Sequence, residues 1–171
     1  MADDPVDPSS VVADPDRLRA VLDTGLMDTG PEEVFDRLTR AAAELTGAPV
    51  AFIALVDADR DFYKSHSGFA EPLAAARQVT GRTFCHYAIA KGETLAIDDT
   101  RAHTVYSRVP TVETMGVAAY LGVPLMDQQG HALGSLCVID FKPRGWRLED
   151  RARLAGLADL AMREIETRRN K

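Results

Sequence analysis

The chain has 171 residues and a formal net charge of −6, from 20 basic and 26 acidic side chains. Hydrophobic residues make up 46% and charged residues 27%, which are ordinary values for a globular domain. The acidic balance argues against nucleic acid as a partner, because a negative surface repels phosphate backbones. We therefore expect one domain, long enough to bury a core.

The N-terminal stretch MADDPVDPSS lacks the basic flank and the apolar segment of a signal peptide. No window approaches the roughly 18 apolar residues that a membrane span needs. The two cysteines, Cys85 and Cys137, show neither CxxC nor zinc-like spacing and do not make a disulfide framework. These features predict a reduced, cytoplasmic protein without membrane contact.

Residues 1–13 are predicted to be disordered, because they are small and acidic and contain Pro and Ser. The folded domain is predicted to span residues 14–171. Its first helix is short, with Asp14 as the cap, Pro15 in the first turn and Gly25 at the end.

A longer helix is predicted within TGPEEVFDRLTRAAAELTG, residues 29–47. Thr29 and Glu32 have the spacing of a capping box, and Gly47 is a natural C-terminal stop. Apolar residues recur at three- and four-residue steps along it, which predicts one buried face.

Two strands follow. The continuous apolar run PVAFIALVD, residues 49–57, is typical of a strand buried on both faces. DFYKSHSG, residues 61–68, predicts an antiparallel partner strand. Strict alternation would place Phe62, Lys64 and His66 on one face, and Tyr63 with Ser65 on the other.

The second half of the chain predicts a helix over residues 83–91 and a short strand at TLAI, residues 94–97. A long polar connection, residues 98–116, separates this strand from a hairpin whose arms are VAAYLGVPLM and HALGSLCVID. A final amphipathic helix is predicted over residues 147–169.

This order predicts an α+β fold with a central, mainly antiparallel sheet. We expect the terminal helices on one face, and the 83–91 helix with the long 98–116 loop covering the other. Such an arrangement leaves a cleft between sheet and loop, which is a natural place for a small molecule.

Four blocks, in this order and spacing, resemble a GAF domain over about residues 18–162. They are LDTGLMDTGPEEVFDRLTRAAAELTGAPVAFIALVDADRDFYKS, TFCHYAIAKGETLAIDDT, AAYLGVPL and LGSLCVIDFKPRGWRLEDRARLAGLADLA. The GSLCVIDFKPR segment resembles those of sensor kinases, cyclases and phosphatase regulators in bacterial signalling. The resemblance implies a small-molecule sensing and dimerisation module, and it names no ligand or cofactor.

The candidate ligand-binding residues are those placed near the expected cleft; no catalytic residue and no metal ligand is assigned. They are Phe84, Cys85, His86, Asp98, His103, Tyr106 and Tyr120.

The Cys85-His86 pair has two interpretations. A cysteine in the first turn of a helix feels the positive end of the macrodipole, which favours a reactive thiolate beside a histidine base. Alternatively, Cys85, Ala88 and Ile89 share one helical face, so Cys85 is a small core residue. Related GAF domains support packing, since they carry Phe-Cys here.

Three further chemistries of GAF relatives remain as alternatives. Covalent bilin attachment would use a slot upstream of Met-Gly-Val that falls near Ser107, which forms no thioether. Free methionine sulfoxide reduction needs a resolving thiol, and Cys137 is expected to be buried and inert in its strand. Haem would use His86 or His103.

Cyclic nucleotide binding would need the start of the 83–91 helix together with Arg101 or Arg108, but the signature of phosphodiesterase GAF domains is not visible. The arguments favour a small-molecule sensing regulatory domain in bacterial signalling, with a thiol redox enzyme or a haem or tetrapyrrole sensor as the alternative. A homodimer and an effector protein acting in trans are the expected partners.

Overall fold

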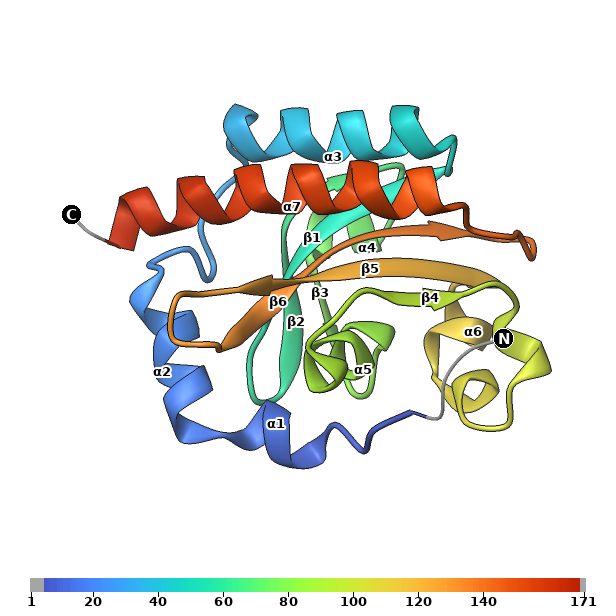
Figure 1. Cartoon of the computed structure of the whole chain (residues 1–171), viewed down its shortest axis with the longest axis horizontal. Coiled ribbons are helices and arrows are strands. Elements are labelled where there is room, and N and C mark those ends of the chain that lie inside the picture. The colour runs from blue at the N-terminus through green and yellow to red at the C-terminus, as the bar shows by residue number, and fades with distance from the viewer. Residues whose placement is uncertain (1–4, 170–171) are drawn as a thin grey trace.

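The computed structural model describes residues 5–169 and is built around one six-stranded sheet (Figure 1). The strand order is β3-β2-β1-β6-β5-β4, and every neighbouring pair is antiparallel. The expected α+β architecture with a mainly antiparallel sheet is thereby confirmed. The strands are β1 (Val50–Val56), β2 (Arg60–Ser67), β3 (Gln78–Thr80), β4 (Leu95–Ile97), β5 (Ala119–Met126) and β6 (Ala132–Asp140).

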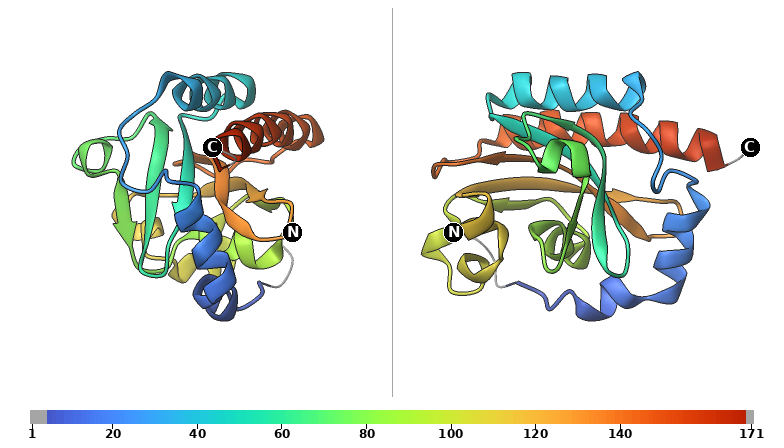
Figure 2. Two further views of the ribbon diagram at one scale, coloured as in Figure 1. Left: turned by 90° about the vertical axis from the view of Figure 1, so that its left-hand side faces the viewer. Right: turned by 180° about the vertical axis from the view of Figure 1, so that it is seen from behind.

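One face of the sheet is covered by α3 (Glu33–Thr46) and α7 (Leu148–Arg169), which run side by side in both views of Figure 2. Their apolar stripes bury Phe35, Leu38, Leu154 and Ile165 against sheet residues. Leu38, Leu154 and Ile165 lie on the stripes that three- and four-residue spacing predicts, whereas Leu45, which the same spacing places on the α3 stripe, is 43% exposed. Burying these stripes supplies much of the hydrophobic stabilisation on this side.

The opposite face is covered by α5 (Phe84–Lys91) and by the connection between β4 and β5 (Figure 1). This connection, expected as a loop, holds three short helices: η1 (Thr100–Ala102), η2 (Tyr106–Arg108) and α6 (Thr111–Thr114). A second apolar cluster, separate from the α3–α7 core, fills the space beneath these segments. Another short helix, α4 (Leu73–Ala76), precedes β3.

The N-terminal segment differs from the disorder predicted for residues 1–13. Residues 9–13 form α1 (Ser9–Ala13), which packs against α5, whereas residues 1–4 lie outside the described residues. The reason is Arg17 in α2 (Pro15–Asp23): its buried guanidinium donates to the carbonyls of Val11, Val12 and Ala132. One cation thus ties α1 to the start of β6. Asp14 caps α2 as expected, accepting from the Asp16 amide.

The predicted capping box at the start of α3 is wrong. Glu32 is the N-cap residue but makes no side-chain cap bond, because its carboxylate pairs with Lys64 and Arg168, each at 2.6 Å. Thr29 Oγ1 donates to the Leu26 carbonyl instead. The C-terminal prediction is confirmed, since Gly47 adopts the left-handed conformation at φ 72°.

A β-bulge between β1 and β2 overturns the strict alternation predicted for β2. The register shifts so that Ile53 pairs with Ser65 and Ala54 with Tyr63, leaving Lys64 as the extra residue. Lys64 and Ser65 therefore both lie on the α3 side of the sheet, where Lys64 donates to Thr29 just before α3 and the Ser65 hydroxyl donates to Asp36 at 2.6 Å. His66 moves to the opposite face and stacks on Phe69.

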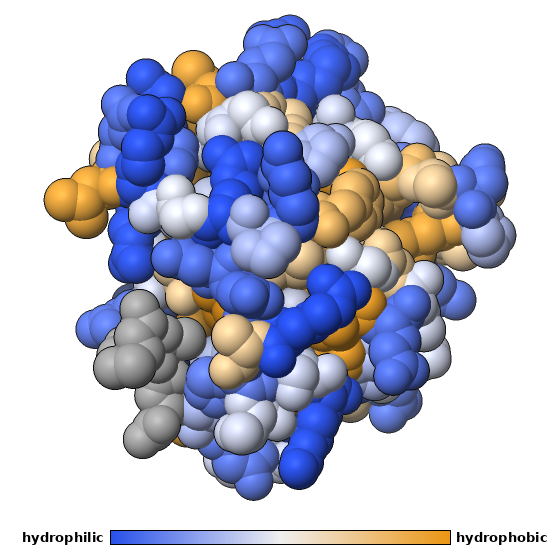
Figure 3. All heavy atoms as spheres, turned by 90° about the vertical axis from the view of Figure 1, so that its right-hand side faces the viewer, coloured by the Kyte–Doolittle hydropathy of each residue, from blue (hydrophilic) through white to orange (hydrophobic). Residues whose placement is uncertain are grey.

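The surface at the right-hand end of Figure 1 is largely hydrophilic, with small separate hydrophobic areas (Figure 3). Within residues 5–169, no helix is both long and apolar enough to cross a bilayer. The large hydrophobic side chains exposed over these residues are scattered along the chain: Val6, Leu22, Leu45, Met126, Phe141, Leu148 and Leu160.

Candidate functional site

The start of α5 points into the interior of the protein. Thr83 is the extended N-cap residue and Gly92, with φ 70°, ends the helix. Phe84, Cys85 and His86 are all buried, with exposed fractions of 3%, 2% and 6%. The Cys85-His86 pair thus begins a packed helix, and Cys85 faces the sheet.

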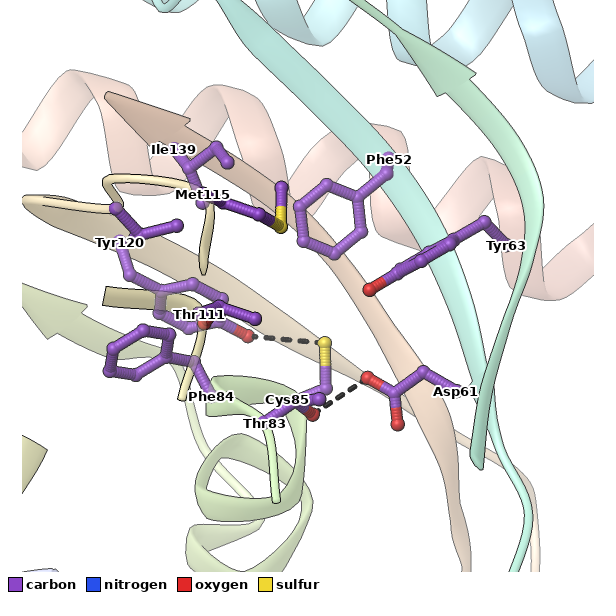
Figure 4. A pocket seen from close by; sticks show the side chains of 11 residues that line it. Phe52, Asp61, Tyr63, Thr83, Phe84, Cys85, Thr111, Met115, Tyr120 and Ile139 are labelled. Atoms are coloured by element: carbon purple, nitrogen blue, oxygen red, sulfur yellow. Dashed lines mark hydrogen bonds between the residues drawn. The ribbon is translucent and has the colours of Figure 1, made fainter. Parts of the chain in front are cut away.

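A cavity lies between the first turn of α5, the sheet and the segment around α6 (Figure 4). The cavity volume open to the centre of a water molecule is about 20 Å³. A buried water needs roughly 10–15 Å³ on this measure, so the closed form holds little more than one water. The walls are mostly aromatic and aliphatic and comprise Phe52, Asp61, Tyr63, Thr83, Phe84, Cys85, Thr111, Met115, Val117, Tyr120 and Ile139.

Asp61 is the one acidic group in this wall, and its side chain is fully buried. Its Oδ2 accepts a hydrogen bond from the Thr83 hydroxyl at 2.7 Å, and its Oδ1 lies 3.1 Å from His86 Nε2. Burial, followed by the negative charge of Asp61, raises the pKa of Tyr63. A buried carboxylate in an apolar wall is costly unless it is hydrogen-bonded, which Thr83 and His86 accomplish here.

His86 faces away from this cavity. Its ring lies between Asp61 and an outer hollow that is also lined by Ser9 of α1 and by Arg82. The histidine therefore separates the cavity from the surface groove beneath α1.

The two cysteines meet at the cavity wall, which Cys85 lines and behind which Cys137 lies. Cys85 Sγ lies 3.7 Å from Cys137 Sγ, and the Tyr120 hydroxyl is 3.0 Å from Cys137 Sγ. The two residues are 52 positions apart in the sequence, and the packing of α5 on β6 brings their thiols together. Cys137 is buried, as expected.

Burial raises the pKa of the Cys85 thiol, and the neighbouring Cys137 raises it further. Burial likewise raises the pKa of Tyr120. The positive end of the helix dipole was expected to lower the pKa of the Cys85 thiol, but desolvation of the buried thiol dominates and raises it. Cys85 is therefore a protonated thiol at neutral pH.

The remaining sequence-predicted residues lie outside the cavity. Asp98 and His103 line a separate hollow beside Trp146, where Asp98 accepts from the Trp146 amide at 3.2 Å. His103 Nδ1 accepts from the Val105 and Tyr106 amides. Tyr106 is buried behind the wall, with its ring 6.2 Å from that of Phe84. Of the seven candidates, only Phe84, Cys85 and Tyr120 line the cavity.

The cavity as it stands is too small for a haem or a tetrapyrrole. The open volume of about 20 Å³ is far below that of a macrocycle. His86, the histidine nearest the cavity, is within hydrogen-bond distance of Asp61 through its Nε2. Ser107, at the expected attachment slot, donates to the Thr104 carbonyl. Within residues 5–169, no group of three or more His, Cys, Asp or Glu side chains could hold a metal ion.

Sequence reasoning missed Asp61, Thr83, Phe52, Tyr63 and the lining residues of the 111–117 segment. Asp61 follows a turn, where aspartate ordinarily caps the backbone, so its position carried no distinct signal. The one available clue was its place directly before the aromatic pair of β2. This clue could be used only if the register of β2 in the sheet were known.

The GAF domain family model matches residues 30–165. A cyclic di-GMP phosphodiesterase of Pseudomonas aeruginosa is 34% identical over 149 residues, which cover 85% of this chain. The chain spans only 24% of the length of that relative.

Solved structures with the same fold come from several classes of protein. The PixJ GAF domain of Thermosynechococcus elongatus, in its blue-light absorbing form, is 19% identical, with a TM-score of 0.64 over 91% of this chain and 90% of that one. A free methionine-R-sulfoxide reductase from Neisseria meningitidis is 20% identical, with a TM-score of 0.64 over 98% and 95%. The GAF domain of a Coxiella burnetii phosphoenolpyruvate-protein phosphotransferase is 15% identical, with a TM-score of 0.65 over 95% and 97%. At these identities the likeness concerns the fold.

Proposed function

Because the chain belongs to the GAF domain family, we propose that it is a regulatory domain of signal transduction that binds a small molecule between its sheet and the 98–116 segment. The observation that carries this proposal is a buried carboxylate, Asp61, in an otherwise apolar and aromatic cavity. Binding sites commonly combine apolar walls with a few fixed polar groups. Asp61 retains acceptor capacity beyond its bonds to Thr83 and His86.

The wall chemistry indicates the class of ligand. The rings of Phe52 and Tyr63 meet edge to face at 5.2 Å, and those of Phe84 and Tyr120 stack at 5.3 Å. Such walls suit a compact apolar or aromatic skeleton. Asp61 favours an ammonium or another hydrogen-bond donor, and it repels an anion. We therefore propose a small amine as the ligand class.

Entry of this ligand requires the cavity to expand. The stretch 111–117, which begins with α6, supplies Thr111, Met115 and Val117 to the wall, and Gly116 within it has a φ of 76°. α6 has four residues, against eight in α5, the other helix that lines the cavity. We propose that α6 acts as the lid and that ligand binding selects its open or rearranged state.

The signal is proposed to reach an effector, either within a longer polypeptide or in trans. The phosphodiesterase relative, of which this chain covers 24%, is one example of a protein that carries further segments. Dimerisation through α3 and α7 is proposed as the route, since both helices pack on the same sheet that forms the cavity floor.

A thiol redox enzyme is less well supported. The Cys85–Cys137 separation of 3.7 Å favours it, but burial raises the pKa of Cys85, whereas a catalytic nucleophile needs a lowered one.

The test uses primary amines with aliphatic and phenyl skeletons, each compared with the alcohol and the carboxylic acid of the same skeleton. Binding to the native state should raise the melting temperature for amines alone. Asp61→Asn should remove the shift, whereas Asp127→Asn should retain it. Asp127 is the matched control, because it is also buried but accepts from amides of the β5–β6 turn. Equal shifts in Asp61→Asn and wild type would disprove the proposed ligand class.

A further inference from the structure

Cys85 and Cys137 form an isolated pair of thiols inside the protein. Their sulfur atoms are 3.7 Å apart, and both residues are free cysteines. Cys85 comes from the first turn of α5 and Cys137 from the middle of β6, two elements that pack directly on each other. Neighbouring packed elements therefore hold the two sulfurs near contact.

Hydroxyl groups surround the pair. The Tyr120 hydroxyl lies 3.0 Å from Cys137 Sγ and donates to Cys85 Sγ at 3.8 Å. Ser135 Oγ lies 2.9 Å from Cys137 Sγ. Tyr120 has room for this contact because Gly122 carries no Cβ, which would stand 2.2 Å from the tyrosine oxygen. These contacts fix the position of the Cys137 sulfur.

The two thiols differ in access. The Cys85 side chain lines the cavity and points into it in Figure 4, whereas Cys137 lies behind it and is not part of the wall. Their exposed fractions are 2% and 0%. A reagent must therefore enter through the cavity and meet Cys85 first. The small volume and the mostly apolar walls favour a small, uncharged oxidant, and the carboxylate of Asp61 in the wall repels an anionic one.

We propose that Cys85 and Cys137 are an oxidation site for small uncharged hydroperoxides, which closes into a disulfide between α5 and β6. In the first step the Cys85 sulfur attacks the peroxide, the O–O bond breaks, and Cys85 becomes a sulfenic acid while an alcohol or water leaves. In the second step the Cys137 sulfur attacks the sulfenic sulfur, and water leaves with the second thiol proton. Two thiols are oxidised and one peroxide is reduced.

Closure needs a modest rearrangement. The sulfurs must approach from 3.7 Å to a bond of about 2.05 Å, which rotation about the Cys85 side chain and a slight shift of α5 supply. The bond would draw the α5 end of the cavity wall toward β6. This site does not rest on the proposed amine ligand, since it requires only the two thiols and an entrance for peroxide.

The pH dependence follows from the burial of Cys85. Its raised pKa leaves little thiolate at neutral pH, so oxidation should be slower than that of an unfolded cysteine. The rate should continue to rise with pH beyond about 8.5, where the thiolate fraction of an ordinary cysteine begins to level off.

The experiment treats the reduced full chain with hydrogen peroxide and, separately, with oxidised glutathione, which is large and charged. Free thiols are then blocked, and intact mass and peptide mapping are measured without reductant. We expect peroxide to give a Cys85–Cys137 cross-linked peptide in monomeric protein, reversible by reductant, and glutathione disulfide to give no adduct. Sulfinic acid at Cys85 without a cross-link, or unchanged thiols under peroxide, would overturn the proposal.

Two variants test the order of the steps. Cys137→Ser should accumulate a Cys85 sulfenic acid that dimedone traps, and Cys85→Ser should leave Cys137 unmodified. Oxidation of Cys137 in Cys85→Ser at the wild-type rate would contradict the assigned entrance. Circular dichroism confirms that each variant is folded, and the wild-type cross-link decides the proposal independently of both variants.

Discussion

Lys64 is a charged residue buried between β2 and α3, with its side chain only 1% exposed. Its ammonium donates to Thr29 Oγ1 and to the Gly30 carbonyl, both at 2.7 Å, and pairs with Glu32 at 2.6 Å. The β-bulge directs this side chain toward α3. A buried cation of this kind is tolerated because every ammonium hydrogen has a partner.

Replacing Lys64 tests this arrangement. Lys64→Met should lower the free energy of unfolding by about 2–4 kcal/mol, because it removes a buried pair and leaves the Gly30 carbonyl without its donor. Arg40→Met is the control, since the Arg40–Glu33 pair is exposed and should contribute less than about 1 kcal/mol. Urea denaturation measures both. Equal losses of unfolding free energy in the two variants would contradict the argument that burial makes the Lys64 interactions stronger than the exposed pair.

Lowering the pH should narrow the difference in free energy of unfolding between the wild type and Lys64→Met. The hydrogen bond from Lys64 lowers the pKa of Glu32, and the bond from Arg168 lowers it further against the opposing effect of burial. A lowered folded-state pKa contributes stability above the ordinary glutamate pKa of about 4.3 and loses it as pH falls through the folded value. Urea denaturation of both proteins at neutral pH, and again at a pH below the pKa range of glutamate, measures this difference.

Among the elements, β1 and β6 pair in the centre of the sheet, with Gly134 opposite Leu55. A Cβ on Gly134 would stand 1.8 Å from the Ala54 carbonyl oxygen. Both strands are buried along their whole length, so neither can move aside. Glycine at this position is therefore a requirement of strand pairing.

Two glycine substitutions separate this requirement from general helix and strand propensity. Gly134→Ala should cost about 3 kcal/mol or more, because the clash is with backbone. Gly156→Ala, on the exposed face of α7 with no atom within 4 Å of its Cβ, should stabilise by about 0.5–1 kcal/mol. Thermal and urea unfolding report both. A neutral Gly134→Ala would show that β1 and β6 can separate at little cost.

Elements marked by local signals were predictable from sequence. Gly47 and Gly92 end their helices in the left-handed conformation, and Pro15 begins α2, as their chemistry requires. The β2 bulge was not predictable, because it depends on pairing with β1. The site depends on tertiary packing even more strongly: Asp61 and Cys137 reach the cavity region only after β2, β6 and α5 assemble.

The whole molecule presents the outer side of α3 and α7 to solvent. Arg153 of α7 donates to the Leu45 carbonyl at the end of α3, and Leu160 lies seven residues, or two helical turns, beyond Arg153. Leu45 and Leu160 are 43% and 48% exposed. Each is thus an apolar side chain that a partner helix could cover, in line with the proposed dimer.

The dimer proposal predicts that the native mass rises with protein concentration. A single charge introduced at the interface should weaken this association. Leu160→Glu should raise the dimer dissociation constant about tenfold or more, because a central apolar contact typically contributes over 1 kcal/mol and the carboxylate would be desolvated. Leu22→Glu is the matched control, since Leu22 is 64% exposed but lies on α2, away from the α3–α7 face. Sedimentation velocity over a wide concentration range measures both. A wild-type monomer throughout, or an equal effect of Leu22→Glu, would remove α3 and α7 as the signalling interface and leave the cavity to act within one subunit.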